Sequence, residues 1–182
     1  MNRGFTLTEV VIVIFVSTVL MLGVFSIYNT YSTTYLFQNA GINTAQSAGS
    51  FLNEFADDVH QADAIITSKT ISGTTYTTGS TTLVLEIPAI NSSGDIVSSA
   101  YDYAILYSSS TYAYRLLSVS GSSARTGGTK KYVDLLSNLT FTYDNATPAN
   151  ATSITADITT QTQVKLQTVQ SHLKQQVYLR NN

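Results

Sequence analysis

The chain contains no cysteine among its 182 residues. It therefore lacks disulfide bonds, thiolate nucleophiles and zinc sites built from cysteine. Charged residues are also scarce, at 11% of the sequence, which is less than half of the roughly one quarter found in typical soluble domains. The formal net charge is −2, so the chain lacks the excess of cations that a long nucleic-acid interface needs. Much of its polarity comes instead from the neutral hydroxyls of 22 serines and 27 threonines.

Residues that could build a catalytic or metal site are few and scattered. The two histidines, His60 and His172, lie far apart in the sequence, and neither a P-loop nor a G-x-S-x-G motif is present. The densest acidic group consists of Asp57, Asp58 and Asp63. Adjacent residues on a helix diverge by about 100°, so we expect a solvated acidic face there instead of a cation site. We predict that the protein is not an enzyme and holds no cofactor or metal.

A nearly unbroken apolar run extends from Val10 to Ile27. A helix of these eighteen residues would span roughly 27 Å, close to the thickness of a bilayer's hydrocarbon core. The run therefore predicts a transmembrane helix. Two alternatives remain open: a cleaved secretory signal, whose apolar core is usually only about 7–15 residues long, and a buried core helix. The interruptions are all small residues: Ser17, Thr18, Gly23 and Ser26.

The residues before this run are unusual for an ordinary membrane anchor. A glutamate at the edge of a membrane span, such as Glu9, costs roughly a few kcal/mol unless a partner offsets its charge. Gly4, immediately before the first aromatic residue, leaves the peptide accessible to a protease. The chain begins Met1-Asn2-Arg3-Gly4-Phe5-Thr6-Leu7-Thr8-Glu9.

The segment from Gly4 to Glu9, followed directly by the apolar run, resembles the type IV prepilin signal. The resemblance implies that a prepilin peptidase cleaves between Gly4 and Phe5 and N-methylates Phe5. It also implies that the Glu9 carboxylate pairs with the terminal amine of a neighbouring subunit and fixes the axial register, since a buried carboxylate is tolerable beside an ammonium group. The leader, residues 1–4, is shorter and less basic than many in the family, and its single cation, Arg3, points to a cytoplasmic N-terminus.

The helix is expected to continue beyond the membrane. No proline occurs before Pro88, and later apolar residues recur at helical spacing. We expect one helix from about Phe5 to about Ala64, in which a bend or melted section would fall near Gly41 or Gly49. The apolar stripe consists of Ala45, Ala48, Leu52, Phe55, Val59, Ala62 and Ile66.

The rest of the chain alternates apolar and polar residues, as strands do. One long helix followed by several strands predicts an α+β fold, in which an antiparallel sheet forms a head on the helix and gives a pilin-like lollipop. We divide the chain into a leader (1–4), a transmembrane and filament-core helix (5–28), a helical continuation into the head (29–66) and a β-rich head (67–182). Strands are predicted at 83–87, 101–107, 112–119, 139–143, 154–158, 164–168 and 173–179, with loops at 72–82, 91–99, 121–129 and 145–153.

The head carries a second, looser resemblance. The order of residues from Phe51 to Ala62 and the ending Leu179-Arg180-Asn181 are similar to minor pilins and pseudopilins of the J type. Such proteins sit at the tip of type II secretion pseudopili, and relatives occur in type IV pilus and competence systems. Major pilins often have a disulfide-bounded C-terminal loop, which a chain without cysteine cannot form, so we expect a minor subunit.

The resemblance implies a structural subunit of a type IV pilus, a type II secretion pseudopilus or a competence filament. Its expected location is the cytoplasmic (inner) membrane, with a single span, a cytoplasmic N-terminus and an extracytoplasmic head, before it joins an extracytoplasmic filament. The implied partners are the prepilin peptidase, other pilin or pseudopilin subunits, and an assembly platform with its ATPase.

The alternative is a tip binding module whose head recognises DNA, a surface or an export substrate. Arg125, Lys130 and Lys131 form the only compact basic group of the head and are therefore the candidate nucleic-acid patch. Three cations neutralise few phosphates, so a solvated loop is the favoured interpretation of this group.

Overall fold

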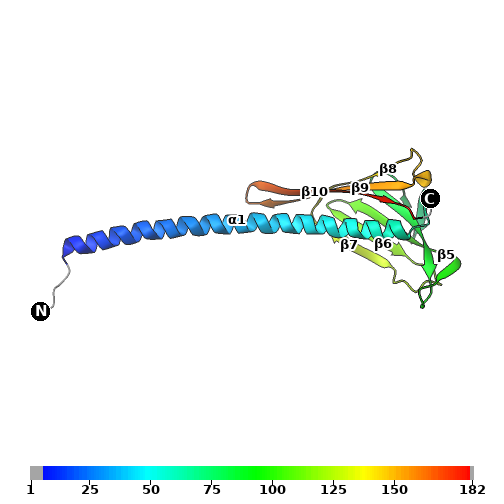
Figure 1. The fold of residues 1–182 in the computed structure, drawn as a ribbon, viewed down its shortest axis with the longest axis horizontal. Coiled ribbons are helices and arrows are strands. Elements are labelled where there is room, and N and C mark those ends of the chain that lie inside the picture. The colour runs from blue at the N-terminus through cyan, green and yellow to red at the C-terminus, as the bar shows by residue number, and fades with distance from the viewer. Residues whose placement is uncertain (1–5, 181–182) are drawn as a thin grey trace. The chain divides into compact units, whose positions relative to one another are not determined.

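The computed structural model describes residues 6–180. A single long helix, α1 (Leu7–Gln61), precedes a region built mainly of strands (Figure 1). The chain forms two compact units, one up to Ala40 and one from Gly41 onward. The boundary falls within α1, so the C-terminal part of the helix belongs to the same unit as the strands.

The helix α1 runs through Gly41 and Gly49 without interruption, so the melted section that was one of the two expectations is wrong. Each glycine costs a helix only about 1 kcal/mol relative to alanine, and Ala48 and Phe51 on either side of Gly49 are buried. The helix ends at Gln61, earlier than the predicted end near Ala64. There the backbone turns to join a strand, and the Asp63 N–H donates to the Glu86 carbonyl at 2.8 Å.

The strands form three antiparallel sheets. The five-stranded sheet has the order β1-β4-β5-β6-β7, the three-stranded sheet has the order β10-β9-β8, and β2 pairs with β3. One long helix packed against antiparallel sheets confirms the predicted α+β fold. The elements are β1 (Ala64–Ile65), β2 (Ser68–Ile71), β3 (Thr74–Thr77), β4 (Thr82–Ile90), β5 (Ile96–Ser109), β6 (Tyr112–Ser118), β7 (Gly128–Val133), β8 (Leu136–Tyr143), the 3-10 turn η1 (Pro148–Asn150), β9 (Ser153–Val164) and β10 (Gln167–Tyr178).

The strand region differs from the sequence prediction in several places. The expected loop at 72–82 contains β3, which pairs with β2 across a turn at Ser72 and Gly73, where φ is 49° and 84°. The strands β1, β2 and β7 were not predicted. The strand expected at 164–168 is instead the end of β9, a two-residue turn and the start of β10; Lys165 in that turn has a φ of 56°.

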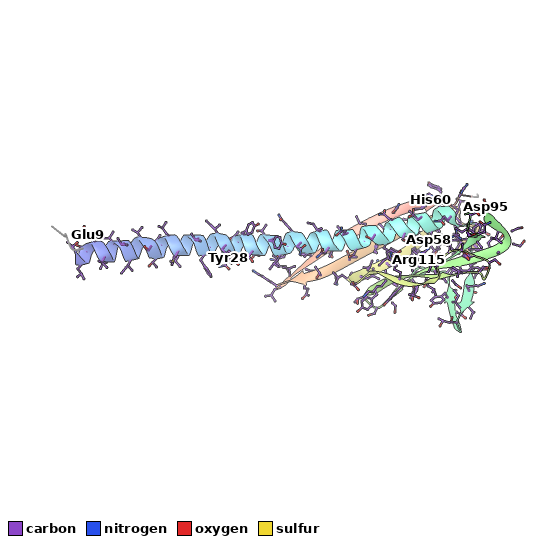
Figure 2. All side chains as sticks on the ribbon, turned by 90° about the horizontal axis from the view of Figure 1, so that it is seen from below. Glu9, Tyr28, Asp58, His60, Asp95 and Arg115 are labelled. Carbon is purple, nitrogen blue, oxygen red and sulfur yellow. The ribbon has the colours of Figure 1, made fainter. Side chains whose placement is uncertain are left out.

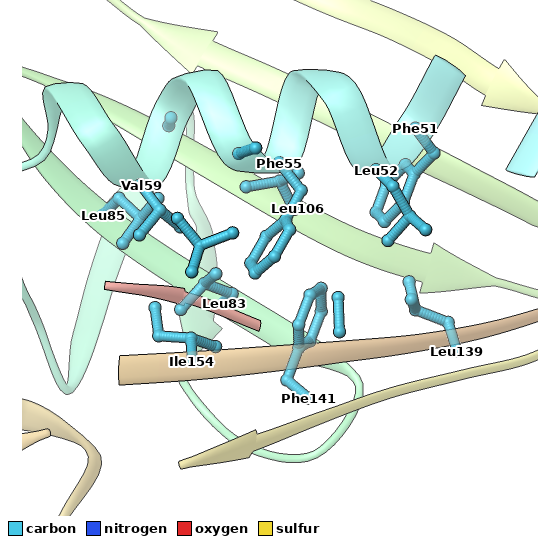
Figure 3. Packing of buried hydrophobic residues seen from close by; sticks show 14 of the residues in the cluster. Phe51, Leu52, Phe55, Val59, Leu83, Leu85, Leu106, Leu139, Phe141 and Ile154 are labelled. Carbon is cyan, nitrogen blue, oxygen red and sulfur yellow. The ribbon is translucent and has the colours of Figure 1, made fainter. Parts of the chain in front are cut away.

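The core lies between the C-terminal part of α1 and the sheets (Figure 3). Phe51, Phe55 and Val59 are fully buried, and the ring centroids of Phe55 and Phe141 are 6.0 Å apart. The predicted stripe is correct except at its two ends: Ala45 is exposed and Ile66 is only half-buried. The neighbouring Thr44 is buried instead of Ala45, and its carbonyl accepts a hydrogen bond from Thr160 Oγ1 at 2.8 Å. From the sheets, the largest fully buried side chains are Leu83, Leu85, Ile87, Ile105, Leu106, Phe141, Ile154 and Ile158.

Candidate processing and assembly site

The first part of α1 exposes its apolar side chains. The exposed fraction of the large apolar residues ranges from 44% at Val10 to 83% at Leu7. Among the residues that the structure describes, α1 is the one helix long and apolar enough to cross a membrane, by length and composition alone. An apolar surface of this size calls for a lipid bilayer or an equally apolar protein partner to cover it.

Glu9 lies at the start of this apolar surface and caps the helix (Figure 2). Its Oε2 accepts hydrogen bonds from the Thr6 N–H and the Thr6 hydroxyl, both at 2.9 Å. In return, Thr6 Oγ1 accepts the Glu9 N–H at 3.3 Å. These reciprocal bonds form a capping box, which satisfies N–H groups that the first turn of a helix leaves without partners.

The capping box orients the carboxylate toward the N-terminal end of α1. An ammonium group arriving there would meet a carboxylate that is already ordered, so less side-chain entropy would be lost on pairing. The predicted cleavage and methylation positions, Gly4 and Phe5, lie outside the described residues, as does Arg3.

The guanidinium of Arg125 donates hydrogen bonds to three other residues of the chain. Its Nη1 donates to Asp102 Oδ2 at 2.8 Å and to the Pro88 carbonyl at 2.6 Å. Its Nη2 donates to Gln61 Oε1 at 3.2 Å. Arg125 therefore ties the segment between β6 and β7 to the end of α1 and to β4.

Asp102, the acidic partner of Arg125, is fully buried in β5. Its carboxylate also accepts hydrogen bonds from Ser123 Oγ at 2.7 Å and from the Ser120 N–H at 2.8 Å. Burial by itself disfavours the charged form, but the hydrogen bonds from Ser123, Arg125 and Ser120 outweigh it and lower the pKa of Asp102.

Lys130 and Lys131 are neighbours in β7 and therefore point to opposite faces of the sheet. Lys130 Nζ lies 4.4 Å from the centroid of the Tyr132 ring. Lys131 Nζ pairs with Asp134 and lies 5.0 Å from the centroid of the Tyr112 ring. The structure thus does not gather these two lysines and Arg125 into one surface, and nucleic-acid binding by them stays a prediction.

An ion cluster that the sequence did not predict joins α1 to β6 and β7. Arg115 Nε and Nη2 donate to the two carboxylate oxygens of Asp58, at 2.8 and 2.7 Å, and Nε lies 3.0 Å from Glu54 Oε1. The Tyr132 hydroxyl donates to Glu54 Oε2 at 2.5 Å. We call these four residues the Arg115 cluster; Asp58 and Arg115 are labelled in Figure 2.

The Arg115 cluster corrects the expectation of a solvated acidic face. The Asp58 side chain is only 2% exposed, whereas the neighbouring Asp57 is exposed. The bond to Asp58 raises the pKa of Arg115, and burial followed by the bond to Glu54 raises the pKa of Tyr132. The sequence held one signal of this cluster: Arg115 alternates with Ala113 and Leu117, which are both buried, so it occupies a core-facing position where a charge needs a partner.

The histidines do not build a site together. His60 is exposed near the end of α1. His172 is exposed on β10, and its Nε2 lies 2.7 Å from Asp157 Oδ1 on β9. Within residues 6–180, no group of three or more histidine, aspartate or glutamate side chains is placed to hold a metal ion.

Comparison with known proteins bears on the N-terminal segment. The family model described as the prokaryotic N-terminal methylation motif matches residues 1–25. No curated protein and no solved structure matches the chain.

The motif implies processing by a prepilin peptidase and assembly with other pilins, and pilin-type proteins are structural. Together with the apolar part of α1, it is consistent with anchoring in the inner membrane before incorporation into a filament. The methylation motif at residues 1–25 and the α+β architecture, one long N-terminal helix packed against antiparallel sheets, are the two features that the chain shares with type IV pilin-like proteins.

Proposed function

We propose that the chain is a minor pilin or pseudopilin, a structural subunit of a type IV pilus, a type II secretion pseudopilus or a competence filament. A prepilin peptidase removes the leader, residues 1–4, and methylates Phe5. Residues 5–28 then hold the subunit in the membrane, with the N-terminus in the cytoplasm and the head outside. The absence of cysteine, and with it of a disulfide-bounded C-terminal loop, favours a minor subunit.

The observation that carries this proposal is the ordered Glu9 carboxylate at the start of a bare apolar helix. During assembly, the apolar surface of α1 leaves lipid for a bundle of equally apolar helices, and Glu9 moves with it. An unpaired carboxylate in such a bundle costs several kcal/mol, on the order of the penalty for a lone buried charge. Assembly is therefore favourable only where a cation meets Glu9.

The sequence restricts which cation can serve. After Arg3, the next lysine or arginine is Lys69, so cleavage after Gly4 leaves the terminal amine of Phe5 as the nearest cation of the mature helix. In a bundle of like helices, the Glu9 carboxylate of one subunit pairs with the Phe5 amine of a neighbour. The axial offset between neighbouring subunits follows from that pairing.

Mass spectrometry of the chain purified from cells that contain a prepilin peptidase tests the processing step. We expect a mature chain that lacks residues 1–4 and carries one methyl group on Phe5. A chain that begins at Met1, or one cleaved beyond the apolar run, would contradict the proposal.

Substitution of Glu9 tests the assembly step. We expect Glu9→Gln to be cleaved normally but to be lost from filaments, because a neutral amide cannot pair with the terminal amine. Asp57→Asn is the matched control, since it removes an exposed carboxylate from the same helix and should be incorporated normally. Filaments that contain Glu9→Gln at the level of Asp57→Asn would count against the proposed pairing.

A further inference from the structure

Three tyrosines follow the apolar run on one side of α1. Tyr28, Tyr31 and Tyr35 are 66, 70 and 58% exposed, and Tyr28 is labelled on the helix in Figure 2. Their spacing of three and then four residues places them on one face, because residues three and four apart are neighbours on a helix surface. The three residues, called the interfacial tyrosines below, begin immediately after Ile27, the end of the apolar run.

The surrounding helix offers no other strong anchor. From Val10 to Asn53 the chain contains no aspartate, glutamate, lysine, arginine or histidine, and it contains no tryptophan anywhere. Membrane helices are usually fixed at the interface by tryptophan, by tyrosine or by lysine and arginine. Tyrosine is the only one of these residue types within this stretch.

Two threonines of this segment, Thr30 and Thr34, are compatible with a poorly hydrated layer. The Thr30 hydroxyl donates to the Ser26 carbonyl and the Thr34 hydroxyl donates to the Thr30 carbonyl, both at 3.0 Å. Hydroxyls bonded in this way within the helix lose little when water is removed. Tyrosine completes the pattern, because its ring favours an apolar surrounding while its hydroxyl favours water.

The tyrosine face begins at the expected height and extends slightly past the interfacial layer. Tyr28 and Tyr35 are seven residues apart, which is about 10 Å along a helix, while each interfacial layer is roughly 5–7 Å thick. Helical side chains lean toward the N-terminus, which shifts all three rings toward the apolar run.

We propose that the interfacial tyrosines bind the lipid headgroup layer on the head side of the membrane and fix the depth and tilt of α1 before assembly. This inference rests on the proposed membrane-spanning state. The commitment to lipid follows from the continuity of the tyrosine face with the apolar run and from the absence of tryptophan, lysine and arginine between Val10 and Asn53.

The absence of tryptophan allows a clean test with the full chain. Phe25→Trp introduces a single tryptophan near the end of the apolar run, and excitation at the red edge of its absorption avoids the twelve tyrosines. The protein is reconstituted in vesicles of phosphatidylethanolamine and phosphatidylglycerol that carry bromine either near the headgroup or deep in the acyl chain. The ratio of quenching by shallow and by deep bromine reports the depth of Trp at position 25.

We expect replacement of all three tyrosines by alanine to change this ratio roughly twofold, because the helix loses its interfacial anchor and slides or tilts. The control variant carries Asn29→Ala, Thr30→Ala and Thr34→Ala, which alter the same height of the helix on its other faces, and it should keep the original ratio. Far-UV circular dichroism verifies that each variant remains folded.

Three results would overturn the proposal. An unchanged ratio in the alanine variant would show that the tyrosines do not set the depth. An unchanged ratio combined with loss of filament incorporation would assign the tyrosine face to a neighbouring subunit. A Trp at position 25 that neither brominated lipid quenches would show that α1 does not span the bilayer, and the proposed function would then fail together with the anchor.

Discussion

Asp102 is a carboxylate that stays charged inside the head because three donors surround it. Its pKa is lowered in the folded state, so it contributes stability above the ordinary aspartate pKa of about 3.9. That contribution is lost as the pH falls through the lowered folded-state value. The effect depends on Arg125, which is the single positive charge that Asp102 contacts among the described residues.

Asp102→Asn should therefore change the acid stability of the head in a defined direction. We expect the variant to be less stable than the original protein at pH 6, and we expect the gap to narrow steadily below about pH 4, where Asp102 itself becomes protonated. Urea unfolding at a series of pH values measures both chains, and carboxylates common to both cancel in the difference. A gap that stays constant from pH 6 to pH 2 would contradict this account.

At the scale of elements, the Arg115 cluster fixes α1 against the five-stranded sheet. Asp58 and Arg115 are 57 residues apart in sequence, and their side chains are 2% and 19% exposed. Breaking a buried pair by removing one partner costs roughly 3–5 kcal/mol, because the other charge stays buried without compensation. Burial of the apolar face of α1 stabilises its packing but is not directional. The two hydrogen bonds from Arg115 to Asp58, by contrast, require one axial position of the helix against the sheet.

Arg115→Met should lower the free energy of unfolding by about 3 kcal/mol, since it leaves Asp58 buried and unpaired. The double variant Arg115→Met, Asp58→Leu should recover a large part of that loss, because it removes both charges. Lys131→Met is the matched control, because it breaks an exposed ion pair. The side chains of Lys131 and Asp134 are 45% and 64% exposed, so this substitution should lower the free energy of unfolding by at most about 1 kcal/mol. Urea unfolding measures all three, and a double variant less stable than the single one would contradict the prediction.

The elements differ in how far the sequence could predict them. In the strands β4, β5, β6 and β8, apolar residues mostly recur at every second position, which is the position that faces the core. The locations of these strands could therefore be predicted from the sequence alone. The strands β3 and β7 consist mostly of threonine, glycine and lysine, and they exist because a neighbouring strand pairs with them. For β7, that pairing sets Lys131 opposite Tyr114, a long-range contact that no local pattern encodes.

The same distinction applies to the sites. The prepilin motif is a linear signal that a peptidase reads along the chain, so it was visible from Gly4 to Glu9. Asp57 and Asp58 are adjacent and of the same residue type, so the sequence does not distinguish them. Asp58 is the buried one because it pairs with Arg115, which is distant in the sequence. Helical spacing likewise continues to Ile66, yet α1 ends at Gln61 because the following backbone pairs with β4.

At the scale of the whole molecule, the two units differ in their content of charged residues and of buried apolar residues. All but one of its cations and all but one of its acids lie from Gly41 onward, and the preceding unit contains only Arg3 and Glu9. The hydrophobic core is likewise complete within the second unit, since its members run from Ala48 to Leu179. The second unit therefore holds the contacts needed for an independently folded, water-soluble head.

A chain that begins at Gly41 should consequently fold alone, with a cooperative thermal transition and the strand content of the full protein by circular dichroism. A chain that begins at Glu54 should fail, because it loses Phe51 and Leu52, each worth about 1.5–3 kcal/mol when buried, from a domain whose total stability is on the order of 5–15 kcal/mol. Both truncations remove the whole apolar run, so the comparison isolates residues 41–53, the first turns of α1 that belong to the second unit. Equal stability of the two chains would mean that the head forms without residues 41–53, and that only the part of α1 from Glu54 onward belongs to the core.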